Sequence, residues 1–126
     1  MGFAILQWNS RSMFKEWQEF KNYLSTLDNL PDVICIQESH LTPKYQPLLT
    51  HYHVIRKDRP PSKGKGGGLM VCVKTSFDFL KIDVTLPGSS NLEVLGTAVH
   101  GFSIFNISNP RSNPFTTPPP LIFYST

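Results

Sequence analysis

The pattern of apolar and polar positions predicts a strand, a helix and a second strand at the start of the chain. Residues 3–8 form a short apolar run, which is typical of a strand covered on both faces. Apolar residues then recur at spacings of four and three, at Met13, Trp17, Phe20, Leu24 and Leu27. This periodicity predicts an amphipathic helix, which Ser12 is placed to cap and Pro31 to end. A second apolar strand follows at 32–37, so the segment predicts a βαβ unit.

The rest of the pattern predicts strands without further helices. Residues 39–50 are expected to form a loop, because Pro43 and Pro47 interrupt them. Strands are predicted at 52–55, 69–73, 79–85, 92–100 and 102–107. The last two are expected to form a hairpin through Gly101. A βαβ unit followed by successive strands predicts an α/β or α+β layered domain with a mixed sheet.

The composition changes abruptly after Asn109. Five of the chain's eleven prolines follow, at Pro110, Pro114, Pro118, Pro119 and Pro120. Proline breaks regular hydrogen bonding, so this segment is expected to be extended or polyproline-like rather than helix or strand. We therefore predict a folded domain over residues 1–110 and a Pro-rich, disordered tail over 111–126.

Composition indicates a small globular domain. The 126 residues are 40% hydrophobic and 17% charged, which is enough apolar material for a core. No apolar run approaches the roughly 20 residues that span a bilayer, and the first residues lack the features of a secretory signal. We expect an intracellular protein, of cytoplasm or nucleus, with no membrane association. Cys35 and Cys72 lie in strand-like runs and are expected to be buried reduced thiols, with a disulfide or metal pair as the alternative.

Positive charge is concentrated in one segment. The formal net charge is +3, and five of the basic residues are Arg56, Lys57, Arg59, Lys63 and Lys65. Prolines and glycines around them predict an exposed loop, whose basic rim is able to meet phosphates. A solvated loop with no ligand is the alternative. The glycines at 66–68 precede a strand rather than a helix, unlike a phosphate-binding P-loop.

Two polar residues follow the first two predicted strands. Asn9 comes after the first and Glu38 after the second. Parallel strands of a βαβ unit end at the same sheet edge, where ligands bind in open α/β sheets. A carboxylate there suits a hard cation such as Mg²⁺, which prefers oxygen ligands. The alternative is that Asn9 caps a turn and Glu38 is a solvated loop residue.

Several segments together resemble a known superfamily. Segments 5–9 (ILQWN), 31–41 (PDVICIQESHL), 56–59 (RKDR) and 66–71 (GGGLMV) are similar, in order and spacing, to the endonuclease/exonuclease/phosphatase superfamily. More narrowly, they resemble the N-terminal apurinic-type endonuclease domain of jockey-like non-LTR retrotransposons. The resemblance covers residues 3 to about 110.

The resemblance implies a four-layer αββα sandwich and a Mg²⁺-dependent (or Mn²⁺-dependent) enzyme that nicks DNA. It implies that Glu38 is the metal-ligand carboxylate and that Asn9 helps to orient the metal and the phosphate. The basic segment 56–65 is then expected to contact the nucleic-acid backbone.

The chain also departs from the superfamily pattern. Ser108 stands where a tyrosine usually contacts the phosphate, no Asp or Glu follows Glu93, and no His follows His100. The expected Asp-x-Asn and Ser-Asp-His elements are thus missing, and with them the general base. We expect a truncated domain, inactive as this chain, with one apolar sheet face uncovered so that it is unstable or aggregates. The alternatives are a noncatalytic nucleic-acid-binding remnant or another phosphodiesterase or phosphatase of the superfamily.

Overall fold

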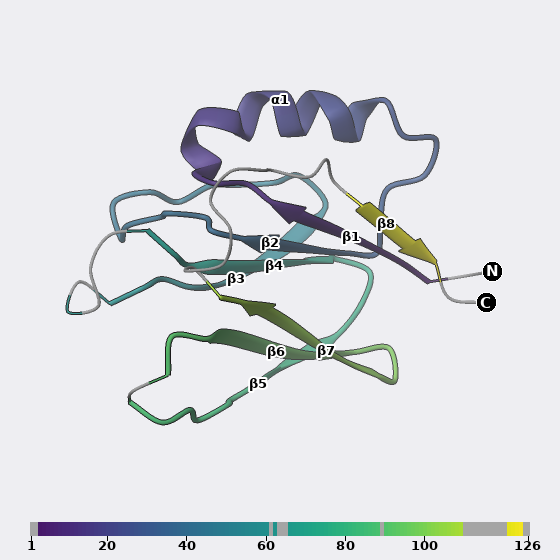
Figure 1. Ribbon diagram of the computed structural model, residues 1–126. Coiled ribbons are helices and arrows are strands. Elements are labelled where there is room, and N and C mark those ends of the chain that lie inside the picture. The colour runs from purple at the N-terminus through teal and green to yellow at the C-terminus, as the bar shows by residue number, and fades with distance from the viewer. Residues whose placement is uncertain (1–2, 61, 63–65, 89, 110–120, 125–126) are drawn as a thin grey trace.

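A computed structural model describes residues 3–60, 62, 66–88 and 90–109, together with the backbone of 121–124 (Figure 1). The chain begins with β1 (Ala4–Asn9), α1 (Met13–Ser25) and β2 (Val33–Gln37). β1 and β2 are parallel neighbours, with Ile5 opposite Val33 and Asn9 opposite Gln37. The predicted βαβ unit is therefore confirmed, because a helix carries the chain back between two parallel strands.

The remaining elements are all strands. They are β3 (Tyr52–Lys57), β4 (Leu69–Lys74), β5 (Phe79–Ile82), β6 (Glu93–Val99), β7 (Phe102–Ser108) and β8 (Leu121–Tyr124). A five-stranded mixed sheet has the order β3-β4-β2-β1-β8, and a three-stranded antiparallel sheet has the order β5-β6-β7. The predicted layered fold with a mixed sheet is confirmed.

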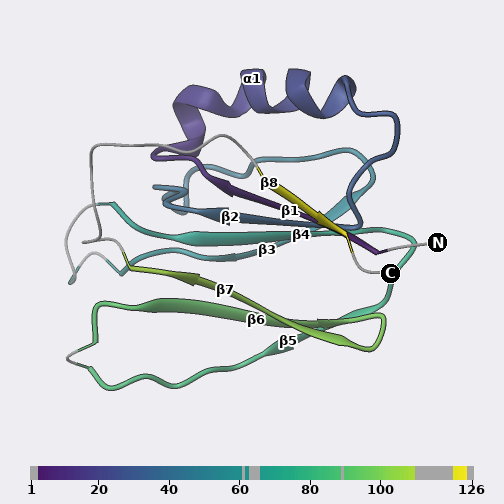
Figure 2. The ribbon, with the colours of Figure 1, turned by 45° about the vertical axis from the view of Figure 1, so that its right-hand side comes forward.

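The elements stack in three layers. α1 lies on one face of the five-stranded sheet, and the three-stranded sheet lies on the other (Figures 1 and 2). Within the described part of the chain these are an α layer and two β layers. This arrangement matches part of the αββα sandwich that the resemblance implies.

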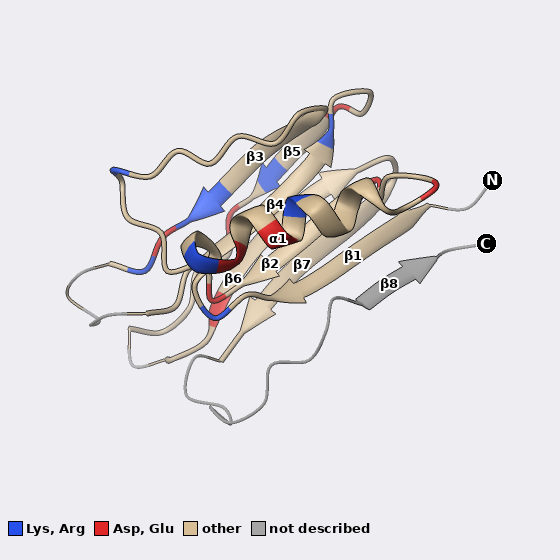
Figure 3. Ribbon diagram, turned by 90° about the horizontal axis from the view of Figure 1, so that it is seen from above, with Lys and Arg blue, Asp and Glu red and all other residues tan. Residues whose placement is uncertain are grey.

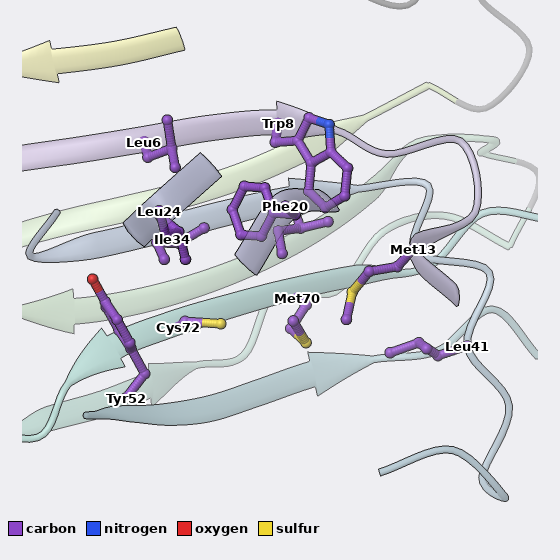
Figure 4. Close-up of a cluster of buried hydrophobic side chains, with 11 residues drawn as sticks. Leu6, Trp8, Met13, Phe20, Leu24, Ile34, Leu41, Tyr52, Met70 and Cys72 are labelled. Carbon is purple, nitrogen blue, oxygen red and sulfur yellow. The ribbon is translucent and has the colours of Figure 1, made fainter. Parts of the chain in front are cut away.

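The first core lies between α1 and the five-stranded sheet. Alternation along β1 directs Leu6 and Trp8 toward the helix, where Phe20 stacks on Trp8 with ring centroids 4.2 Å apart (Figure 4). The predicted helix periodicity is confirmed, since Met13, Phe20 and Leu24 are buried. Burial of each large apolar side chain contributes about 1.5–3 kcal/mol.

The second core lies between the two sheets. Val71 and Val73 of β4 meet Leu95 and Val99 of β6 in this layer. Cys35 also belongs to this second core, whereas Cys72 belongs to the first. The two cysteines are free and buried, as predicted, and face opposite sides of one sheet. Burial raises the pKa of the Cys35 thiol to about 12 and also raises the pKa of the Cys72 thiol.

A buried amide connects the two sheets. Asn106 of β7 is 2% exposed, and its Nδ2 donates to the carbonyl oxygens of Ile36 and Met70, each at 3.0 Å. Its Oδ1 accepts a hydrogen bond from Gln37 Nε2. The Asn106 side chain thus hydrogen-bonds main-chain carbonyls of β2 and β4 and the side chain of Gln37. This network fixes how β7 sits over β2 and β4.

Two sequence predictions about strand limits need correction. β5 ends at Ile82 rather than continuing to residue 85. The segment 111–126 is not wholly irregular, because Leu121–Tyr124 forms β8 and pairs antiparallel with β1. Local composition misses this strand because its hydrogen-bond partners lie more than a hundred residues earlier. Residues 110–120 and 125–126 lie outside the described residues, and the boundary at 110 stays a prediction.

The hairpin at Gly101 is confirmed. His100 and Gly101 have φ values of 50° and 80°. Positive φ at both central residues characterises the type I′ turn, whose twist suits antiparallel strands. Among the described residues, no helix combines the length and apolar character that crossing a membrane requires.

Candidate functional site

The carboxyl ends of β1 and β2 form one edge of the five-stranded sheet. Asn9 is the last residue of β1, and Glu38 directly follows β2. Asn9 lies opposite Gln37 in the parallel register, so Glu38 is one residue beyond that pair. The structure therefore brings the two predicted site residues to neighbouring strand ends. Both residues are half-buried.

The turn after β1 wraps around the end of β2 and holds this edge together. Ser10 donates from its amide to the Gln37 carbonyl at 3.0 Å and from its Oγ to the Glu38 carbonyl at 3.0 Å. The Ser12 amide also donates to the Glu38 carbonyl, at 3.0 Å. The predicted capping role of Ser12 is wrong, because its side chain makes no cap hydrogen bond to α1. Ser10 provides the side-chain hydrogen bonds of this turn instead.

Left-handed backbone conformations are concentrated around this edge. Six described residues other than glycine have positive φ values, and four of them lie here: Arg11 (52°), Ser12 (121°), Glu38 (50°) and His40 (53°). Such conformations cost about 1–2 kcal/mol per residue for side chains with a Cβ. Strained residues of this kind cluster at functional sites, where surrounding contacts hold them in place.

The glycines at 66–68 support the edge from the β4 side. The amides of Ser39 and His40 donate to the carbonyls of Gly68 and Gly67, at 3.1 and 2.8 Å. A Cβ at Gly68 would lie 2.6 Å from Ser39 Oγ, which is closer than packed atoms allow. Gly68 also has a φ of 93°. The glycine run therefore serves close backbone packing before a strand, in agreement with the prediction that it is not a P-loop.

Three unpartnered polar atoms belong to residues of this edge. Among the described residues, four buried side-chain atoms lack a hydrogen-bond partner: Asn9 Oδ1, Arg11 Nη2, Ser39 Oγ and Thr97 Oγ1. Each such atom costs about 1–3 kcal/mol until a ligand or water meets it. The edge thus holds a buried, unpartnered acceptor on Asn9 and a buried, unpartnered cationic donor on Arg11. An acceptor suits a cation, and a guanidinium N–H suits an anion such as phosphate.

Arg11 and Ser39 were not predicted as site residues. A basic residue in the turn at the carboxyl edge of the sheet was an available signal for Arg11. Nothing in the sequence marks Ser39, because its burial depends on the distant glycines.

The edge carries side-chain oxygens of the kind that bind metal ions, but Glu38 is the one carboxylate at these two strand ends. Asn9 Oδ1 and the Glu38 carboxylate are both hard oxygen donors. Over the described ranges, no group of three or more His, Cys, Asp or Glu residues is placed to hold a metal ion. Mg²⁺ keeps several waters and binds through one or two protein carboxylates, so the donor set fits that ion.

The predicted basic rim is partly incorporated into the fold. Arg56 and Lys57 lie in β3 rather than in a loop, which corrects the sequence prediction. The Arg56 guanidinium pairs with Asp58 at 2.7 Å and also donates to the carbonyls of Thr42 and Tyr45. Lys57 Nζ donates to the Val94 carbonyl at 3.1 Å. These two cations therefore have protein partners that a phosphate must compete with.

The other members of the predicted rim lie nearer the glycine run. Arg59 is half-buried, and its Cδ lies 2.8 Å from where a Cβ at Gly67 would be. Glu93, at the start of β6, accepts a hydrogen bond from the Gly68 amide at 2.9 Å. Lys63 and Lys65 lie outside the described residues. Ser108, the residue in the tyrosine position of the resemblance, is buried at the end of β7 opposite Glu93.

Comparisons with known proteins define the fold class. No family model matches the chain, and no curated protein matches it. Solved structures do match, among them the 3′-5′ exonuclease NExo from Neisseria meningitidis and a point variant of the 3′ phosphatase NExo from Neisseria bound to a product DNA hairpin. Each gives a TM-score of 0.63 at 20% identity over 82% of this chain. The chain therefore shares the fold of these neighbours, and it spans 40% of their length.

Proposed function

We propose that the chain is the first part of a divalent-metal-dependent phosphodiesterase domain that acts on DNA. The observation that carries the proposal is the sheet edge at which β1 and β2 end. Asn9 lies opposite Gln37 there, and Glu38 is the next residue after Gln37. The fold likeness to an exonuclease and a 3′ phosphatase supports it. On a finer level, we propose an apurinic-type endonuclease of a non-LTR retrotransposon as the origin, on the strength of the sequence resemblance.

Each residue of the edge has a proposed role. Glu38 would hold Mg²⁺ or Mn²⁺ with its carboxylate, and Asn9 would add the amide oxygen that lacks a protein partner. The metal, when bound, supplies positive charge that stabilises the charge developing on a phosphodiester. Arg11 would donate its unpartnered Nη2–H to a phosphate oxygen that reaches it. Ser10 keeps the two strand ends together through its hydrogen bonds.

We further propose that these 126 residues do not turn over substrate by themselves. No Asp or Glu follows Glu93 and no His follows His100, so the residues that activate water in the resembling enzymes have no counterparts here. Loss of a general base typically lowers rates by about 10²–10⁴-fold. A noncatalytic nucleic-acid-binding role is the second candidate function, and this incomplete acid–base set is the observation that favours it. A 3′ phosphatase or exonuclease specificity is the remaining alternative within the class.

Metal binding and cleavage are tested separately. Binding of Mn²⁺ is followed by electron paramagnetic resonance, and Glu38→Gln is expected to weaken it by roughly tenfold or more, equivalent to about 1.4 kcal/mol. Glu16→Gln, an exposed carboxylate on α1, is the matched control and should leave binding unchanged. Equal Mn²⁺ binding by wild type and Glu38→Gln would contradict the proposed metal role.

Cleavage is assayed on supercoiled plasmid, a 3′-phosphorylated oligonucleotide and a 3′-hydroxyl duplex, each with Mg²⁺. No cleavage above background is expected from the wild-type chain. Nicking that Glu38→Gln abolishes would support the class and overturn the proposed inactivity. Release of inorganic phosphate or of mononucleotides would instead identify the phosphatase or exonuclease specificity. A salt-dependent DNA-binding titration, measured in parallel, tests the noncatalytic candidate.

A further inference from the structure

An aromatic groove lies beside the candidate site. It runs between the first turns of α1 and the loop that follows β2, holds about 260 Å³ of free volume, and is lined by Phe14, Trp17, Leu41, Tyr45, Gln46 and Pro47. Phe14 and Tyr45 are 60% and 43% exposed, and their ring centroids are 4.5 Å apart. Exposed aromatic side chains gathered at a hollow mark interaction sites more often than isolated exposed residues do.

The groove is held in place by contacts within the protein. The Arg56 guanidinium, paired with Asp58, donates to the carbonyls of Thr42 and Tyr45. Leu41 is buried in the first core. The loop that presents the Tyr45 ring is therefore fixed at both of its sides. A ligand that stacks on a fixed ring loses less conformational entropy on binding than one that must order the loop.

The charge around the aromatic groove favours an anionic ligand. The exposed residues Lys15 and Lys44 are the sequence neighbours of Phe14 and Tyr45. Figure 3 shows basic positions at the start of α1 and in the loop between β2 and β3. The acidic residues of α1, Glu16 and Glu19, line a different hollow together with Trp8, Phe20 and Tyr23. Aromatic rings flanked by cations match a nucleotide, whose base stacks and whose phosphate is negative.

The aromatic groove is continuous with the candidate site. Met13, which also lines the groove, donates from its amide to the Ser39 carbonyl at 3.1 Å. The preceding residue, Ser12, donates to the Glu38 carbonyl. A nucleotide whose base occupied the groove would therefore extend its backbone toward the sheet edge that carries Glu38 and Arg11.

We propose that the aromatic groove binds an unpaired nucleobase of single-stranded DNA next to the candidate phosphodiester site. The inference rests on the proposed function in taking DNA as the partner. Gln18 and Gln46 also line the groove, but their amide nitrogens donate to Asn22 Oδ1 and to the Pro43 carbonyl. Recognition is therefore expected to come from stacking, which tolerates any base. The substrate class is therefore DNA with an unpaired or extruded nucleotide, rather than continuous duplex.

Trp17 lines the groove and reports binding directly. Its fluorescence is titrated with an oligothymidylate, the same backbone without bases, and a blunt duplex, all in EDTA so that no metal or cleavage is involved. Quenching is expected to require bases and single strands. Loss of one base stack corresponds to roughly a 5–150-fold weaker affinity. Trp17→Phe, which leaves buried Trp8 as the remaining tryptophan, should abolish the quenching.

Substitutions separate stacking from nonspecific attraction. Phe14→Ala and Tyr45→Ala are each expected to weaken oligothymidylate binding by roughly 5–150-fold, and Tyr45→Phe is expected to keep the wild-type affinity. Leu48→Ala, an exposed apolar residue in the same loop but outside the groove, is the matched control. Equal affinity for the abasic and base-carrying strands, or unchanged binding by Phe14→Ala and Tyr45→Ala, would overturn the inference. Absence of any quenching, as expected if the groove receives a protein segment instead, would overturn it too.

The two proposals fail in distinguishable ways. Base-dependent binding that persists in Glu38→Gln supports the aromatic groove even if the metal role is wrong. Mn²⁺ binding that depends on Glu38, without base-dependent quenching, supports the proposed function and refutes a role of the aromatic groove in DNA binding.

Discussion

The outer face of the three-stranded sheet is predicted to drive self-association. Leu80, Phe105 and Ile107 are 73%, 48% and 53% exposed. The strand period of two and the β5-β6-β7 register place all three on the face away from the five-stranded sheet. Large side chains offer about 150–250 Å² each, so these three together expose roughly 300 Å². Apolar patches of that size on soluble monomers commonly mark contact surfaces.

The expected strength of this association follows from the area. Two such faces meeting would remove about 600 Å² from water, equivalent to about 15 kcal/mol at about 25 cal/mol/Å². Lost translational and rotational freedom costs about 4–15 kcal/mol, and the area is half of the roughly 1,200 Å² that stable specific interfaces bury. We therefore expect weak, concentration-dependent association, with an apparent Kd of roughly tens of micromolar.

Light scattering coupled to size-exclusion chromatography measures this association over a wide concentration range. Leu80→Lys with Ile107→Lys should keep the chain monomeric, because burying a charge on each face costs more than the apolar contact contributes. Ser76→Lys with Thr85→Lys adds the same charge at exposed positions outside the strands and should not prevent association. A wild-type chain that stays monomeric at the highest concentrations refutes the argument. Equal solubilisation by both double variants would attribute the effect to net charge instead.

Two further predictions concern the core. Asn106→Ala removes the buried amide that hydrogen-bonds two main-chain carbonyls and Gln37. It is expected to lower the free energy of unfolding, measured by urea titration, by about 2–5 kcal/mol. Asn91→Ala, at an exposed position, is the control and should change this free energy by less than about 0.5 kcal/mol. Burial raises the pKa of the Cys35 thiol to about 12 and raises that of Cys72 as well. The folded state therefore favours the neutral thiols, and their contribution to the free energy of unfolding is complete below about pH 9. It is lost as pH rises from about 9 toward 12, by up to about 1.4 kcal/mol per pH unit for each thiol. Both thiols should resist a disulfide reagent at neutral pH until urea unfolds the chain, and rapid reaction of the native protein would contradict this burial.

Local periodicity was sufficient to predict most of the fold. The helix stripe of α1 and the apolar runs of β1, β2 and β4 follow from spacing alone, because each buries a face that the sequence pattern already defines. The juxtaposition of Asn9 and Glu38 also followed, since parallel neighbours in a βαβ unit end at the same edge.

Predictions that depended on distant partners were incomplete. Ser12 has the residue type and position of a helix cap, yet its amide and backbone angles are determined by Glu38, far along the chain. The sequence predicts that Arg56 is an exposed cation in a loop. In the structure its guanidinium pairs with Asp58 and donates hydrogen bonds to carbonyls of the preceding loop. The β8 strand was missed for the same reason, because its partner is β1.

The same long-range contacts hold the backbone of the candidate site in place. The left-handed residues at the sheet edge are unfavourable in isolation, so they persist only because hydrogen bonds from Ser10 and Ser12 to Glu38, and from Ser39 to Gly68, fix the backbone around them. The proposed metal and DNA binding therefore depends on a backbone that the fold itself holds in place, and we expect it to persist even if the proposed lack of cleavage is confirmed.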